Sequence, residues 1–207
     1  TGATDAYLVT LPNRWMDVHQ NEVLVEVLVN ARQSPTGSPV GVTVRDRAVG
    51  AGLAYLAGGA LSAARRVFED VEQMLYGKVT NPLAAAAGAY VLVGTETDRS
   101  PKPWHNWLNH LRSWFGWMSD GSILWAVHAL RTADTEAQVD QARAALVEAY
   151  WRGVPFYTLG LSWLIDSLSD FPEDDECLRM LNEVRRLSWR VDTRQPFVVL
   201  GLNGRPS

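Results

Sequence analysis

The stretch from residue 104 to residue 130 holds five of the nine tryptophans and three of the four histidines of the chain. Each buried tryptophan removes roughly 150–250 Å² from water, so this stretch forms either a core on which other helices pack or a recognition surface. Its hydrophobic periodicity predicts two helices separated by a tight break at Ser119-Asp120-Gly121. The rest of the chain is expected to fold around these two helices.

Composition and charge exclude several classes of protein. Of the 207 residues, 47% are hydrophobic and 20% are charged, which is typical of a globular domain. The net charge of −4, without a long basic run, argues against binding to nucleic acid. The single cysteine, Cys177, forms no internal disulfide and builds no cysteine-based zinc site. A single cysteine fits a reducing, cytoplasmic location. No apolar run reaches the roughly 18 residues of a membrane span, so we expect a soluble protein.

Strand-like segments lie near both ends of the chain. Residues 6–12 and 22–29 are rich in β-branched residues, and residues 195–202 are similar. The region between Asn30 and Val42 contains two prolines, two glycines and two serines, which is typical of a linker. We therefore predict a β-hairpin-like segment and linker over 1–42 and a helical domain over 43–207 that ends in a short strand, with the terminal strands able to pair.

The central part of the chain shows helical patterns. Apolar residues from Leu61 to Leu75 recur at steps of three and four, which predicts an amphipathic helix ending at Gly77. Residues 83–93 are apolar on all sides after an Asn81-Pro82 helix start, so this helix belongs at the centre. Asp120 is expected to cap the second helix of the tryptophan-rich stretch. The fold class is therefore mainly α, with antiparallel helical hairpins forming a bundle or a short solenoid and a small β element from both termini.

No recognisable catalytic or metal-binding set appears. His105 and His110 are five residues apart and point about 140° away from each other on a helix, so they cannot bind one metal. Cys177 lies among acidic residues that oppose a thiolate. The acids at 173–176 are explained as helix capping. We predict no catalytic residue, no metal and no cofactor, and we expect that this chain alone is not an enzyme.

Two interpretations of the aromatic residues remain. In the first, Trp107, Trp114, Phe115 and Trp125 are core, and an exposed aromatic edge binds a protein partner. The candidate binding residues are Trp104, His105, Arg112, Trp117 and Trp151. In the alternative, an enzyme or small-ligand-binding domain has a pocket between the tryptophan-rich helix and its neighbours, with acid/base residues drawn from His105, His110 and His128.

A resemblance to a known group of proteins covers about residues 60–170. It rests on two segments, MLYGKVTNPLAAAAGAYVLVG and WLNHLRSWFGWMSDGSILWAVHAL. Through the Tyr-Gly-Lys turn, the Asn-Pro helix start and the Trp-Phe-x-x-x-x-Asp-Gly motif, they resemble the helical C-terminal accessory region of bacterial multidomain proteins with caspase-like or subtilisin-like protease domains. The resemblance implies a non-enzymatic sensor or scaffold module whose partner is another protein or an adjacent domain of the same polypeptide. No pattern in the sequence indicates an oligomeric state.

Overall fold

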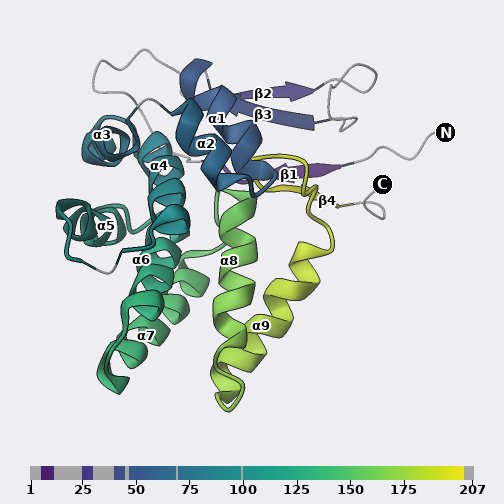
Figure 1. Cartoon of the computed structure of the whole chain (residues 1–207). Coiled ribbons are helices and arrows are strands. Elements are labelled where there is room, and N and C mark those ends of the chain that lie inside the picture. Colours follow the sequence, from purple (N-terminus) through teal and green to yellow (C-terminus); the bar gives the residue numbers. More distant parts are fainter. Residues whose placement is uncertain are drawn as a thin grey trace.

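The computed structural model describes residues 6–11, 25–29, 40–44, 47–68, 70–98 and 100–202. These residues confirm a mainly α fold with small antiparallel β elements from both termini (Figure 1). The helices are α1 Arg47–Ala57, α2 Leu61–Val67, α3 Val71–Tyr76, α4 Pro82–Thr95, α5 Pro103–Trp114, α6 Ser119–Thr132, α7 Glu136–Arg152, α8 Thr158–Ser169 and α9 Asp175–Ser188, with a 3-10 turn η1 Gly77–Val79 between α3 and α4.

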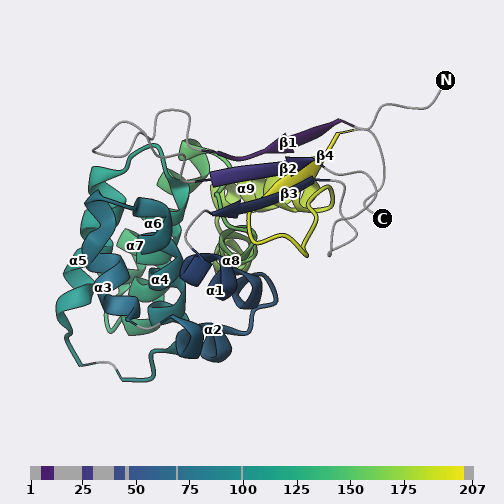
Figure 2. The same ribbon diagram turned by 90° about the horizontal axis from the view of Figure 1, so that it is seen from above.

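The strands form two antiparallel pairs. β1 (Tyr7–Val9) pairs with β4 (Val199–Gly201), which confirms the predicted pairing of the C-terminal strand with an N-terminal one. β2 (Val25–Val29) pairs with β3 (Val40–Val44). β3 was not predicted. Its residues lie between a segment with the composition of a linker and a segment with a helical pattern, so the sequence did not distinguish them as a strand. Both pairs lie on the same side of the helical body (Figure 2).

Helix α4 occupies the centre of the helical body. The Asn81 side chain accepts a hydrogen bond from the Ala84 amide at 3.0 Å, and Pro82 takes the first helical position, as the sequence predicted. Residues 82–93 are all buried, and α4 contacts helices α1, α2, α3, α5 and α6. Neither α4 nor any other helix in the described residues is long and apolar enough to cross a membrane.

The single amphipathic helix predicted from Leu61 to Leu75 is two helices. The backbone becomes extended at Phe68, and the Asp70 side chain begins α3 by accepting from the Gln73 amide at 2.9 Å. The break places the Phe68 ring against Gly52 of α1, where an added Cβ would lie only 1.9 Å from a ring atom. The helix is therefore interrupted where its aromatic residue fills a space that only glycine leaves open.

Asp120 does not cap α6, contrary to the prediction, because it lies inside the helix and is fully buried. Its carboxylate accepts hydrogen bonds from the Tyr90 hydroxyl at 2.8 Å and from the backbone amides of Phe156 and Tyr157 at 2.7 and 3.3 Å. Burial raises the pKa of Asp120 to about 6. One carboxylate thus joins α4, α6 and the segment entering α8.

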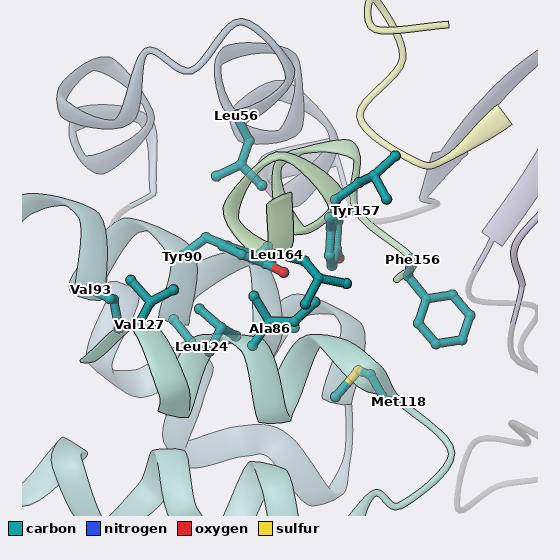
Figure 3. Packing of buried hydrophobic residues seen from close by; sticks show 14 of the residues in the cluster. Leu56, Ala86, Tyr90, Val93, Met118, Leu124, Val127, Phe156, Tyr157 and Leu164 are labelled. Atoms are coloured by element: carbon teal, nitrogen blue, oxygen red, sulfur yellow. The ribbon is translucent and has the colours of Figure 1, made fainter. Parts of the chain in front are cut away.

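The hydrophobic core surrounds this carboxylate. Tyr90 and Tyr157 pack edge to face with ring centroids 5.8 Å apart, and the Tyr157 hydroxyl donates to the Leu83 carbonyl at 2.7 Å. Figure 3 shows these rings among buried aliphatic side chains from α1, α4, α6 and α8. Because both tyrosine hydroxyls have acceptors, the core accommodates these polar groups without an unpaired donor.

Candidate functional site

Trp104, the first candidate binding residue, is buried, which corrects the expectation that it lies exposed. It sits in the first turn of α5 and faces α6. Its ring centroid lies 4.3 Å from that of His105 and 5.4 Å from that of His128. Trp104 therefore belongs to the α5–α6 contact and presents little surface to a partner.

The structure brings His105 of α5 and His128 of α6 together, with ring centroids 4.3 Å apart. His105 Nδ1 accepts from the Lys102 amide at 3.3 Å, whereas its buried Nε2 has no hydrogen-bond partner within the described residues. Burial, reinforced by His105, lowers the pKa of His128 to about 4, and burial also lowers the pKa of His105. Both rings are therefore neutral near pH 7.

This histidine pair was missed because its members are 23 residues apart on separate helices and no spacing rule joins them. The carboxylate of Glu96 lies near enough to influence both histidines, but it is hydrogen-bonded to the Lys102 ammonium at 2.7 Å. No group of three or more histidine, cysteine, aspartate or glutamate side chains is placed to bind a metal in the part of the chain that the structure describes.

Arg112 forms part of a polar network at the junction of α5, α6 and α7. Its Nε donates to the Glu148 carboxylate at 2.8 Å, and its guanidinium lies 4.5 Å above the Trp125 ring. Arg152 also pairs with Glu148 and donates to the Arg112 carbonyl at 2.8 Å. Since these contacts satisfy much of its hydrogen-bonding capacity, Arg112 is better placed to hold the helices together than to bind a partner.

Trp117 and Trp151 are exposed, as the sequence predicted. The Trp117 side chain is 41% exposed and packs edge to face on Phe115 and Phe156. Trp151 is 70% exposed near the end of α7, where its ring contacts Tyr150. Their role in binding stays a prediction, because exposure shows that they are accessible and does not show what they contact.

A further aromatic group gathers around Lys78, which η1 places against α5. The Lys78 ammonium lies 6.0 Å from the ring centroid of Tyr76, 5.8 Å from that of Trp107 and 5.3 Å from that of Trp114. His110 stacks on Trp114, with centroids 4.6 Å apart and planes 6° apart. We call these five residues the Lys78 cluster.

The Lys78 cluster combines a buried lysine residue with exposed rings. Burial lowers the pKa of the Lys78 ammonium, and no carboxylate of the described residues lies within ion-pair distance of it. Attraction to the ring faces offsets part of the cost of desolvation, by roughly 0.5–2 kcal/mol for a favourable cation–ring pair. Tyr76 is 59% exposed and Trp114 56% exposed, so the cluster is open to a partner on its outer side.

Sequence reasoning missed this cluster by assigning Trp114 to the core. Helical periodicity places Trp107, Leu108, Leu111 and Trp114 on one broad face, but it does not show how far neighbouring elements extend along that face. In the structure, Leu108 and Leu111 are buried, Trp107 is half-buried and Trp114 is exposed. The spacing of His110 and Trp114 at i and i+4, which predicts contact on a helix, was the available signal.

A hollow of about 470 Å³ adjoins the cluster at Trp107. Its other lining residues come mainly from α2 and α3 and include Arg65, Asp70 and Glu72. The alternative interpretation placed a pocket between the tryptophan-rich helix and its neighbours with histidine as the acid/base. This hollow borders α5 through Trp107 and has no histidine in its lining.

Together, the fold and the cluster define a mainly helical domain with an aromatic surface and no recognised catalytic set among the described residues. A protein-family model described as "Y4kD C-terminal domain" matches residues 51–199. The chain belongs to this family. The matched range runs from within α1 to the first residue of β4 and contains the whole Lys78 cluster. No curated protein and no solved structure matches the chain.

Proposed function

We propose that this domain is a non-enzymatic protein-interaction module that binds its partner through the Lys78 cluster. The observation that carries the proposal is a buried lysine residue whose ammonium lies beside two aromatic rings that are more than half exposed. Aromatic side chains are enriched among the residues that dominate binding energy at protein interfaces. Tyr76 and Trp114 are rigid apolar anchors of this type, and they come from separate elements that the core holds in place.

The charge of the cluster indicates the chemistry of the partner. The Lys78 residue is buried, which lowers the pKa of its ammonium, and no carboxylate of the described residues lies within ion-pair distance of it. A partner carboxylate would restore the interactions that burial removed. We therefore propose that the partner is a protein surface with apolar side chains around one acidic residue. The apolar side chains would cover Tyr76 and Trp114.

An adjacent domain of the same polypeptide is the first partner to examine. The family description names a C-terminal domain, which supports a position within a longer protein. The chain also resembles accessory regions of bacterial proteins with caspase-like or subtilisin-like protease domains. We therefore propose that the adjacent domain is a protease. In this proposal the module senses a signal or holds a substrate, and the chemistry takes place elsewhere.

Site-specific photo-crosslinking tests the proposed surface. p-Benzoylphenylalanine would replace Tyr76 in one variant and Trp189 in a control, within the full-length natural protein expressed in its source cells. Trp189 is 78% exposed at the end of α9. Helix α9 lies apart from α3 and α5, which carry most of the cluster (Figure 1). We expect a discrete crosslinked product only at position 76, with the crosslinked peptide containing an acidic residue. Equal crosslinking at both positions, or none at position 76, would contradict the proposal.

A further inference from the structure

A second hollow lies away from the Lys78 cluster, where the end of α7 approaches α8 and α9. It has a volume of about 220 Å³. Its walls are apolar and are formed chiefly by Val154, Leu161, Leu164, Val184 and Leu187. Leu161 and Leu164 belong to α8, and Val184 and Leu187 belong to α9, so the α8–α9 hairpin supplies most of the surface. Because helix α5 contributes no lining residue, this hollow is distinct from the pocket proposed in the alternative interpretation.

Three polar contacts join α7 to α9 or to its N-cap residue Asp174. The Tyr150 hydroxyl of α7 donates a hydrogen bond to the Glu183 carboxylate of α9, and both residues line the hollow. Nearer the start of α9, Arg143 pairs with Asp174 and with Glu176, the latter at 3.1 Å. These contacts connect the two helices, and the hollow lies where residues of α7, α8 and α9 meet.

The lining of the hollow determines the ligand that it can accept. An apolar cavity of about 150 Å³ holds a molecule of benzene, so 220 Å³ accommodates a somewhat larger ring system. The Glu183 carboxylate has two oxygens and uses Oε2 to accept from Tyr150. Its Oε1 accepts no hydrogen bond from the described residues and is available to a ligand.

We propose that this hollow binds a small aromatic molecule that carries one N–H or O–H donor. The ring lies between the leucine and valine side chains, and its donor faces the Glu183 carboxylate beside the Tyr150 hydroxyl. Indole has this chemistry and size, with one N–H on a two-ring apolar frame. The proposed site is separate from the protein-binding surface, so it adds a ligand-binding activity to the module.

Titration of the 207-residue chain with indole and with toluene tests the proposal. Indole has a donor and toluene has none, and binding is followed by NMR of methyl-labelled leucine and valine. We expect saturable indole-induced shifts at Leu161, Leu164, Val184 and Leu187. Glu183→Gln replaces a charged acceptor by a neutral one, so it should weaken indole binding about tenfold and leave toluene binding unchanged.

The exposed Glu173→Gln serves as a control, because it makes the same chemical change outside the hollow. Leu187→Phe, which extends into the hollow, should weaken the binding of both compounds. Two results would overturn the proposal. One is the absence of saturable shifts at the four residues up to the solubility of indole. The other is an equal effect of Glu183→Gln on indole and toluene.

Discussion

At the scale of single residues, Asp120 has the most informative environment. The sequence predicted that Asp120 caps a helix, whereas its buried carboxylate accepts hydrogen bonds from Tyr90, Phe156 and Tyr157. The local sequence shows that an aspartate at this position could cap a helix. It contains no information on which donors from distant parts of the chain approach the same carboxylate. The contact between Asp120 and Tyr157 spans 37 residues, so it depends on how α6 and α8 pack.

Asp120 should make the stability of the fold depend on pH. Its pKa of about 6 in the folded chain exceeds the ordinary value of 3.8, so the folded state binds more protons between these values. The contribution of Asp120 to the free energy of unfolding should therefore fall by about 2 kcal/mol as pH rises from 4 to 6. His128, whose pKa is lowered to about 4, acts in the opposite direction over the same range. Urea denaturation should show that the free energy of unfolding of the natural chain, measured relative to that of Asp120→Asn, falls by about this amount between pH 4 and pH 6.

The exposed Asp175→Asn is the matched control, since it makes the same change at the surface. It should leave the slope of stability against pH unchanged between pH 4 and pH 6. An identical slope in Asp120→Asn and the natural chain would show that Asp120 is not the responsible group.

At the scale of elements, the sequence predicted individual helices better than their contacts. The N-cap of α4 at Asn81 and the apolar character of residues 82–93 were sufficient to place a central helix. The break between α2 and α3 was not predictable, because Phe68 satisfies the helical pattern and turns inward only where Gly52 leaves space. Trp114 shows the same limit, since its exposure depends on where the neighbouring α3 and η1 end.

The junction of α5, α6 and α7 depends on Glu148, which pairs with both Arg112 and Arg152. Burial lowers the pKa of the Arg152 guanidinium, while Glu148 acts in the opposite direction. Glu148→Gln should leave two neighbouring guanidinium groups without a charged partner. The free energy of unfolding is expected to fall by about 1–3 kcal/mol, measured by urea denaturation at pH 7.

The control for this prediction is Glu173→Gln, which removes an exposed carboxylate just before α9. It should change the free energy of unfolding by no more than about 0.5 kcal/mol, as is usual for substitutions at exposed positions. If Glu148→Gln were equally mild, the network would contribute little to the helix junction, and Arg112 would be available for another role.

At the scale of the whole molecule, the tryptophan-rich stretch contributes to both the core and the surface. Trp104 is buried between α5 and α6, and Trp114 lies exposed in the Lys78 cluster. The sequence predicted that the chain folds around this stretch, but the central helix is α4, and the sequence assigned Trp104 and Trp114 the wrong way round. It also could not place Lys78 beside α5, because that contact joins η1 to a helix some 30 residues further along the chain.

The central claim is that the Lys78 cluster binds the partner. The affinity of this chain for the partner identified by crosslinking tests that claim most directly. Isothermal titration calorimetry would compare the natural chain with Trp114→Ala and with Trp189→Ala, which removes an equally large exposed ring outside the cluster. If the Lys78 cluster is the binding surface, Trp114→Ala should raise Kd at least about tenfold and Trp189→Ala should change it by less than about twofold. An unchanged Kd for Trp114→Ala would contradict the account.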